Sequence, residues 1–113
     1  MFLQLFQVYK KVKVTWSAIA KIQYYDTLIF WNEHNQSNEY SKKIRAKIKE
    51  ASSKLSSYPK IGKDRPEDRE VRQIIVLSHF SLFYRIYEIN EDLTEIVIVT
   101  FWDNRNDPNK LKF

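Results

Sequence analysis

The stretch that decides the fold runs from Asp68 to Pro108 and reads DREVRQIIVLSHFSLFYRIYEINEDLTEIVIVTFWDNRNDP. It contains three runs rich in Val, Ile, Phe, Tyr and Thr, a composition typical of strands that are half-buried in a sheet. The runs are Val71–Leu77, Phe80–Ile89 and Thr94–Trp102. Because the links between them are too short for crossover connections, the sequence predicts three antiparallel neighbours in a meander.

Alternation along these runs assigns the side chains to the two faces of the sheet. In the middle run, one face carries Phe80, Leu82, Tyr84 and Ile86, and the other carries Ser81, Phe83, Arg85 and Tyr87. In the last run, Ile96 and Ile98 oppose Val97, Val99 and Phe101. A strand that is apolar on both faces is expected in the centre of the sheet, and this one leads into a polar tail, Asp103–Pro108.

The half of the chain before the meander predicts one strand and two helices. Val12–Trp16 alternates like a strand, and Ser17 then occupies a helix N-cap position. The next apolar residues recur every three or four positions and predict helices over Ser17–His34 and Ser37–Tyr58, the second stopped by Pro59. Their apolar stripes are Ala20, Tyr24, Leu28 and Trp31, and then Tyr40, Ile44, Ile48, Ala51, Leu55 and Tyr58.

This order of elements predicts an α+β domain with both helices on one face of an antiparallel sheet. The other face is then free as a working surface. We expect Lys60–Arg69, which holds the only glycine, Gly62, to be a charged loop. We expect the core to contain Trp16, Tyr24, Leu28, Trp31, Ile44, Ile48, Leu55, Ile98, and Phe101 or its neighbours.

Composition restricts the function. A chain of 113 residues with 43% apolar and 15% aromatic residues is long enough for one globular domain, Met1–Phe113. It has no cysteine, one glycine and two distant histidines, which disfavours a metal site, a glycine-rich phosphate loop or another cofactor site. The net charge of +5 favours an anionic partner such as nucleic acid or an acidic protein.

The first eleven residues, Met1–Lys11, are apolar but lack the basic start and small-residue cleavage site of a secretory signal. No segment approaches the about 20 apolar residues of a membrane span. We therefore expect a cytoplasmic protein without a membrane partner. Two interpretations of this segment stay open: an added strand or turn on the body, or a start codon placed too far upstream.

Four segments together resemble the RelE/ParE superfamily of bacterial type II toxin–antitoxin toxins. They are VTWSAIAKIQYY, LSSYPKIGKD, VRQIIV with FSLFYRIYE, and IVTFWDNRNDP. The resemblance covers Val12–Leu111 and leaves residues 1–11 as an extension outside the family pattern. It implies a sheet with the first strand beside the last, and a partner antitoxin that masks the working surface.

The resemblance implies one of two activities, because some members of the superfamily cleave mRNA and others poison DNA gyrase. The ribonuclease branch cleaves mRNA on the ribosome and needs cations around the phosphate together with a general acid and base. Arg72 and Arg105 match cationic positions of that branch, but Ser81 and Ile74 stand where it carries cations, and no tyrosine follows Arg105. These departures favour the ParE branch, which poisons DNA gyrase without catalysis, while ribosome-dependent mRNA cleavage and an inert partner-binding relative remain alternatives.

Four residues are candidates for the functional surface: Arg72, Arg85, Arg105 and His79. Arginines held on rigid strands suit phosphate or carboxylate, because the guanidinium offers paired donors in one plane. We expect Arg72 or Arg85 on the face away from the helices, with Arg105 and His79 at its rim. Each also has a simpler interpretation, since His79 lies in a tight turn and the arginines suit surface ion pairs.

Overall fold

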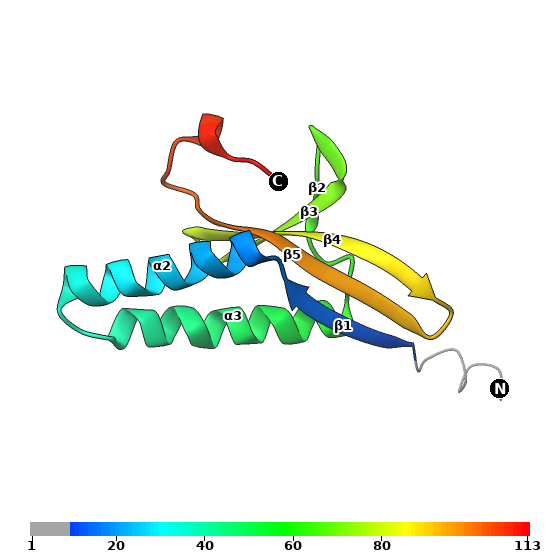
Figure 1. Ribbon diagram of the computed structural model, residues 1–113, viewed down its shortest axis with the longest axis horizontal. Coiled ribbons are helices and arrows are strands. Elements are labelled where there is room, and N and C mark those ends of the chain that lie inside the picture. Colours follow the sequence, from blue (N-terminus) through cyan, green and yellow to red (C-terminus); the bar gives the residue numbers. More distant parts are fainter. Residues whose placement is uncertain (1–9) are drawn as a thin grey trace.

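The computed structural model describes residues 10–113, in which two long helices cover one face of a five-stranded sheet (Figure 1). The order is β1 (Lys11–Trp16), α2 (Ala18–Asn35), α3 (Glu39–Ser57), β2 (Lys63–Arg65), β3 (Asp68–Val76), β4 (Phe80–Asn90), β5 (Leu93–Asp103) and the short 3-10 helix η1 (Pro108–Lys110). The predictions for Met1–Lys11 concern residues that, apart from Lys10 and Lys11, lie outside the described range.

The strands are arranged in the order β1-β5-β4-β3-β2. β3, β4 and β5 form the predicted antiparallel meander, and β1 pairs with β5 in parallel, so the first strand does lie beside the last. β5 is therefore a central strand, which explains why its sequence is apolar on both faces. The predicted α+β class is confirmed.

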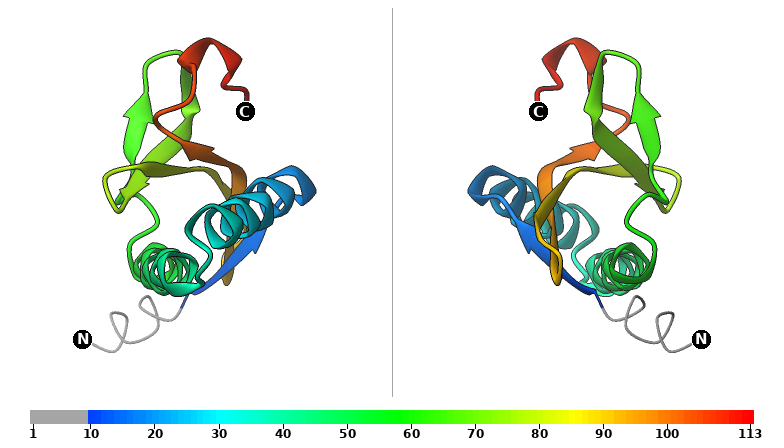
Figure 2. Two further views of the ribbon diagram at one scale, coloured as in Figure 1. Left: turned by 90° about the vertical axis from the view of Figure 1, so that its left-hand side faces the viewer. Right: turned by 90° about the vertical axis from the view of Figure 1, so that its right-hand side faces the viewer.

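The core lies between the sheet and the two helices, which occupy the same side of the sheet in both views of Figure 2. The sheet contributes Val76, Phe80, Leu82, Tyr84, Ile96, Ile98 and Phe101, and the helices contribute Ala20, Leu28, Ile44, Ile48, Ala51 and Leu55. Of the nine residues predicted for the core, six are buried, and Trp16, Tyr24 and Trp31 are half-buried at its border. The stripe of α3 ends at Leu55, because Tyr58 is exposed.

Ser17 joins the end of β1 to the start of α2, as predicted. Its hydroxyl accepts a hydrogen bond from the backbone N–H of Ala20 at 3.0 Å and donates one to the carbonyl of Val99 at 3.1 Å. One helical turn later, the side-chain oxygen of Gln23 accepts from the N–H of Phe101 at 2.9 Å. The start of α2 thus supplies hydrogen-bond partners to β5 where β1 no longer runs beside it.

The predicted alternation of β5 was wrong at its end. The register with β4 shifts between Phe83, opposite Thr100, and Tyr84, opposite Ile98, which leaves Val99 as the extra residue of a β-bulge. An inserted residue reverses the faces that follow it, so Phe101 joins Ile96 and Ile98 in the core. Simple alternation along one strand cannot reveal such an insertion.

The segment Lys60–Arg69 was predicted as a loop, but it contains the edge strand β2, paired with β3. Its composition, Lys-Asp-Arg, hides the strand, since strand prediction rests on apolar and β-branched residues. The pairing sets Asp64 opposite Arg72, and their side chains form an ion pair at 3.2 Å. Charged side chains on an edge strand also discourage pairing with other chains.

The β3–β4 turn begins one residue earlier than predicted. Leu77 and Ser78 both adopt positive φ, at 55° and 62°, so Leu77 belongs to the turn rather than to the strand. Positive φ is uncommon for residues other than glycine, and nothing in the identity of a leucine predicts it.

The sheet face opposite the helices is only partly free, because the end of the chain covers one part of it (Figure 1). The ring of Phe113 packs on Phe83 at a centroid distance of 4.7 Å, and the hydroxyl of Thr100 donates to the carbonyl of Lys112 at 2.9 Å. The guanidinium of Arg65 lies 5.4 Å from the centre of the Phe83 ring. Phe83 and Thr100, which these tail residues contact, are buried.

Candidate functional site

Arg72 lies on β3 directly opposite Tyr84, and so on the side of the sheet that faces the helices. Its guanidinium donates to the carbonyls of Lys60 and Gly62, at 3.1 and 2.7 Å, besides pairing with Asp64. These bonds hold the segment after α3 against the sheet. The contacts of Arg72 are therefore those of a side chain that fixes a loop.

Arg85 lies on β4 and points to the face away from the helices, as alternation predicted. Its guanidinium pairs with Asp68 at 3.0 Å and with Glu70 at 3.3 Å, both on β3. Arg72 and Arg85 also line one shallow cavity of about 330 Å³, together with Arg69, Glu70, Ile86 and Tyr87. The structure thus brings two of the candidate arginines to one place, where a third arginine and a carboxylate join them.

Arg105 and His79 lie elsewhere, where β5 ends beside the β3–β4 turn. The backbone N–H of Asn104 donates to the carbonyl of His79 at 2.7 Å. The guanidinium of Arg105 holds both oxygens of Asp103, at 2.9 and 2.8 Å. It also lies 5.2 Å from the centre of the Trp31 ring and 5.7 Å from that of Phe80. The four predicted residues therefore form two groups rather than one cluster.

Three acidic residues that the sequence did not identify as part of these groups are Asp68, Glu70 and Asp103, the carboxylates that pair with Arg85 and Arg105. The spacing of Asp103, two residues before Arg105, was a signal for that pairing. The two partners of Arg85 lie on the neighbouring strand β3. The sequence alone does not show which residues of two strands lie side by side. Each candidate arginine thus has an internal carboxylate partner.

At Ser81 and Ile74, the two positions that depart from the ribonuclease pattern, the side chains contact other residues of the fold. The hydroxyl of Ser81 accepts from the side-chain amide of Gln73 and donates to the side-chain oxygen of Asn104, both at 2.7 Å. Ile74 packs against the core. Ser81 therefore fixes the end of β5 to β3, and Ile74 closes the helix-facing side of the sheet.

Ionisation of Asp103 is coupled to its contact with Arg105. Burial by itself would raise the pKa of the Asp103 carboxyl, but hydrogen bonds from the Arg105 side chain and backbone hold it below the ordinary value of 3.8. A carboxyl with a lowered folded-state pKa stabilises the fold above its unfolded pKa, and this stabilisation is lost as pH falls through the folded value.

We therefore expect Asp103→Asn to destabilise the protein at neutral pH, and expect the difference from wild type to shrink below about pH 4. Chemical denaturation of both proteins between pH 7 and pH 2.5 measures this difference. Asp92→Asn, which changes an exposed carboxyl in the β4–β5 turn, is the matched control. A difference that stays constant down to pH 2.5 would contradict the ion pair.

Neither a metal centre nor a membrane span is found in the described residues. Among residues 10–113, no group of three or more His, Asp or Glu side chains could hold a metal ion. In the same range, no helix is long and apolar enough to cross a membrane.

The guanidinium groups of both arginine groups can bind an external anion only if that anion displaces the carboxylates now paired with them.

Comparison with known proteins agrees with this fold. The family model of the ParE toxin of the type II toxin–antitoxin system, parDE, matches residues 12–108. A solved structure described as the chromosomal ParDE TA system from P. aeruginosa is similar at 21% identity and a TM-score of 0.63, covering 83% of this chain and 97% of that one. No curated protein matches the chain. Because the family model spans both helices and every strand but the first residue of β1, the chain belongs to the ParE toxin family of type II toxin–antitoxin systems.

Proposed function

We propose that this protein arrests bacterial growth by poisoning DNA gyrase in the cytoplasm, and that a cognate antitoxin neutralises it. The observation that carries the proposal is the match to the ParE toxin family over residues 12–108, which include all four candidate residues. ParE toxins act by binding a macromolecular target, so no set of catalytic groups is required.

The contacts of the candidate arginines support a binding role over catalysis. A general acid or base must reach the substrate, and a catalytic cation must face the charge that develops on it. Arg72, Arg85 and Arg105 are each paired with a carboxylate, and Arg72 is further occupied by two carbonyls. Ser81 and Ile74 supply neither charge nor a proton-transfer group at the two positions where a ribonuclease would carry cations.

An exposed apolar face on α2 supports the expectation of an antitoxin partner. Five large apolar side chains on this helix are half or more exposed: Ile19, Ile22, Tyr25, Ile29 and Phe30. Apolar surface of this extent on one helix usually marks a protein interface. We expect the product of a short neighbouring reading frame, acidic and rich in helix, to co-purify with the chain; its absence favours a solitary module.

Pulse labelling after induction tests the choice of target. After induction, we expect protein synthesis to continue at first while the DNA-damage (SOS) response begins, because gyrase poisoning breaks DNA before it affects ribosomes. Immediate loss of amino-acid incorporation would instead assign ribosome-dependent mRNA cleavage. Unchanged growth would leave the chain as an inert partner-binding relative and would contradict the proposal.

Arg105, which follows β5, is the most exposed of the three candidate arginines. The side chain of Arg105 is 44% exposed and lines a cavity of about 540 Å³ with Asp26, Thr27, Phe30, Trp31, Asp103 and Asn106. We expect Arg105→Ala to relieve growth arrest while leaving the chain folded, because the residue lies outside the core and the substitution mainly removes its ion pair with Asp103. Growth after induction, at matched expression, measures the effect.

Lys13→Ala is the control for this substitution, since it removes an exposed cation from β1, away from Arg105. The control is expected to remain fully toxic. If Arg105→Ala is equally toxic, the arginine is structural, and the working surface lies elsewhere, with the lysine-rich face of α3 the next region to test. Antitoxin affinity is expected to fall less than toxicity, because such partners bind over wide surfaces.

A further inference from the structure

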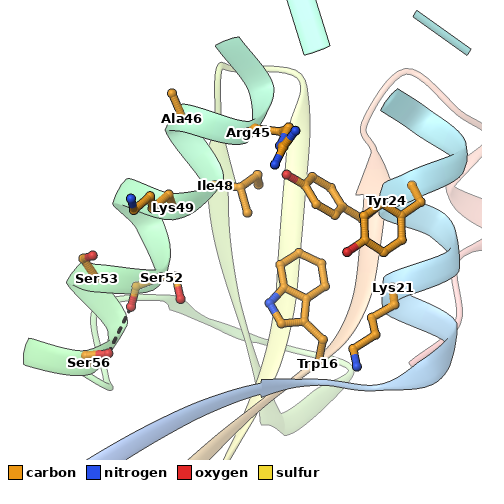
Figure 3. Close-up of a pocket in the computed structure, with 11 residues that line it drawn as sticks. Trp16, Lys21, Tyr24, Arg45, Ala46, Ile48, Lys49, Ser52, Ser53 and Ser56 are labelled. Carbon is orange, nitrogen blue, oxygen red and sulfur yellow. Dashed lines mark hydrogen bonds between the residues drawn. The ribbon is translucent and has the colours of Figure 1, made fainter. Parts of the chain in front are cut away.

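A cleft between α2, α3 and the end of β1 lies outside both groups of candidate residues (Figure 3). Its volume is about 570 Å³, within the range of small-molecule sites in proteins. Figure 3 shows Trp16 at the base of the cleft, between the two helices. The lining residues are Trp16, Lys21, Tyr24, Tyr25, Arg45, Ala46, Ile48, Lys49, Ser52, Ser53 and Ser56.

One wall of the cleft is aromatic. The rings of Trp16 and Tyr24 lie 5.1 Å apart at an angle of 38°, and Tyr25 adds a third ring at 5.5 Å from Tyr24. Trp16 and Tyr24 are half-buried, so each still presents surface to the cleft. Burial raises the pKa of the Tyr24 hydroxyl although nearby Arg45 acts to lower it, so this hydroxyl is neutral and adds no negative charge. Flat apolar faces of this kind suit a planar ring such as a nucleobase.

The charges around the cleft have one sign. Lys21 reaches it from α2 and Arg45 from α3, while Lys49 lies at its outer rim, one turn after Arg45 (Figure 3). No carboxylate lines the cleft. In the described part of the chain, none of the ion pairs involves Lys21, Arg45 or Lys49.

Four arginines in and beside the sheet differ from Arg45 in their contacts. Arg65, Arg72, Arg85 and Arg105 each pair with an internal carboxylate, whereas Arg45 contacts the hydroxyl of Tyr24. Cations without a nearby counter-charge attract an external anion, and a guanidinium and an ammonium are suitable donors to phosphate. The hydroxyl of Ser52 adds a neutral donor on the α3 side.

We propose that this cleft binds a nucleoside phosphate, with its base against Trp16 and Tyr24 and its negative charge held by Arg45 and Lys21 at the two ends of the cleft. A nucleotide unites the two chemistries that the cleft presents, a planar ring and several negative charges. An acidic peptide would satisfy the cations but would leave the aromatic wall without a matching group. This site does not depend on the target of the toxin, because none of Arg72, Arg85, Arg105 and His79 lines the cleft. Tyr25 belongs both to the cleft and to the exposed apolar face of α2.

Calorimetric titration of the purified full chain with ATP and with GTP tests this site. The expected result is saturable binding of at least one nucleotide with a dissociation constant below about 1 mM. Inorganic phosphate is titrated in parallel and is expected to bind at least tenfold more weakly, because it lacks the base. No nucleotide binding at millimolar concentration would overturn the proposal, and so would equal affinity for phosphate.

Substitutions locate the binding. We expect Arg45→Gln and Lys21→Gln each to weaken nucleotide binding about tenfold, since each removes a charge-assisted hydrogen bond. Lys43→Gln removes a cation from another face of α3, outside the cleft, and is expected to leave binding unchanged. Equal losses in all three variants would mean that the nucleotide binds to general positive charge, which would contradict a defined site.

Fluorescence reports on the aromatic wall. In the variant Trp31→Phe/Trp102→Phe, Trp16 is the only tryptophan, and we expect nucleotide to quench it with the dissociation constant that calorimetry gives for the unsubstituted chain. Binding without any change at Trp16 would place the base elsewhere. Binding of an acidic peptide such as oligoglutamate in place of nucleotide would assign the cleft to a protein partner and overturn the proposal.

Discussion

Replacing Gly62 with alanine is expected to lower the free energy of unfolding by about 3 kcal/mol, as overpacking of a buried site does in its upper range. A Cβ atom at this position would lie 2.5 Å from the hydroxyl oxygen of Tyr84, 2.6 Å from its ring carbon Cε1 and 2.9 Å from Cζ. Tyr84 cannot move aside, because its side chain is fully buried and its hydroxyl donates to the carbonyl of Pro59 at 2.8 Å. The same hydroxyl accepts from the N–H of Gly62, also at 2.8 Å, so a movement of the ring away from the new Cβ would break this hydrogen bond as well.

Urea denaturation of Gly62→Ala measures this loss, with Lys63→Ala, an exposed neighbour, as the control. Adding Gly62→Ala to the background of Tyr84→Leu removes the opposing ring and is expected to cost much less, which identifies the clash as the cause. A loss below about 1 kcal/mol in the wild-type background would show that the chain after Pro59 adjusts, contrary to the tight contact described here.

The second large effect on the free energy of unfolding is expected when a buried side chain on either helix is shortened to alanine. Leu28 on α2 and Ile48 on α3 belong to the hydrophobic core and are 8% and 5% exposed. We expect Leu28→Ala and Ile48→Ala each to cost about 2–5 kcal/mol, the range for cavities left by lost methyl and methylene groups. Denaturant unfolding measures both.

Ile22→Ala is the matched control, because Ile22 lies on the exposed face of α2 and is 60% exposed. Its expected effect is within about 0.5 kcal/mol, since surface substitutions rarely do more. If the three substitutions cost similar amounts, the assignment of inner and outer helix faces would be wrong.

The helices and the three-strand meander could be predicted because their signals lie within a few residues of each other. Prediction failed where a feature depends on pairing with a distant segment. Ser17, Pro59 and the apolar stripes fixed the helices, because capping, proline geometry and helical periodicity all act within a few residues. The bulge at Val99 and the strand β2 depend on pairing with β4 and β3, so their causes lie in other segments of the chain.

The candidate site was less predictable than the fold for the same reason. The sequence identified Arg72, Arg85, Arg105 and His79, but it did not show that Arg85 meets Asp68 or that Arg72 holds the carbonyl of Gly62. Those partners are set by strand register and by a loop that returns to the sheet. The cleft beside Trp16 was not predicted at all, since it needs α2, α3 and β1 together.

A supercoiling assay with purified DNA gyrase and the purified chain decides whether the protein poisons gyrase. We expect the chain to inhibit supercoiling and broken DNA to accumulate with gyrase attached. Addition of the cognate antitoxin should restore activity, and Arg105→Ala should inhibit less than Lys13→Ala. Full gyrase activity at a large excess of the chain, combined with cleavage of mRNA on ribosomes by the same preparation, would contradict the account.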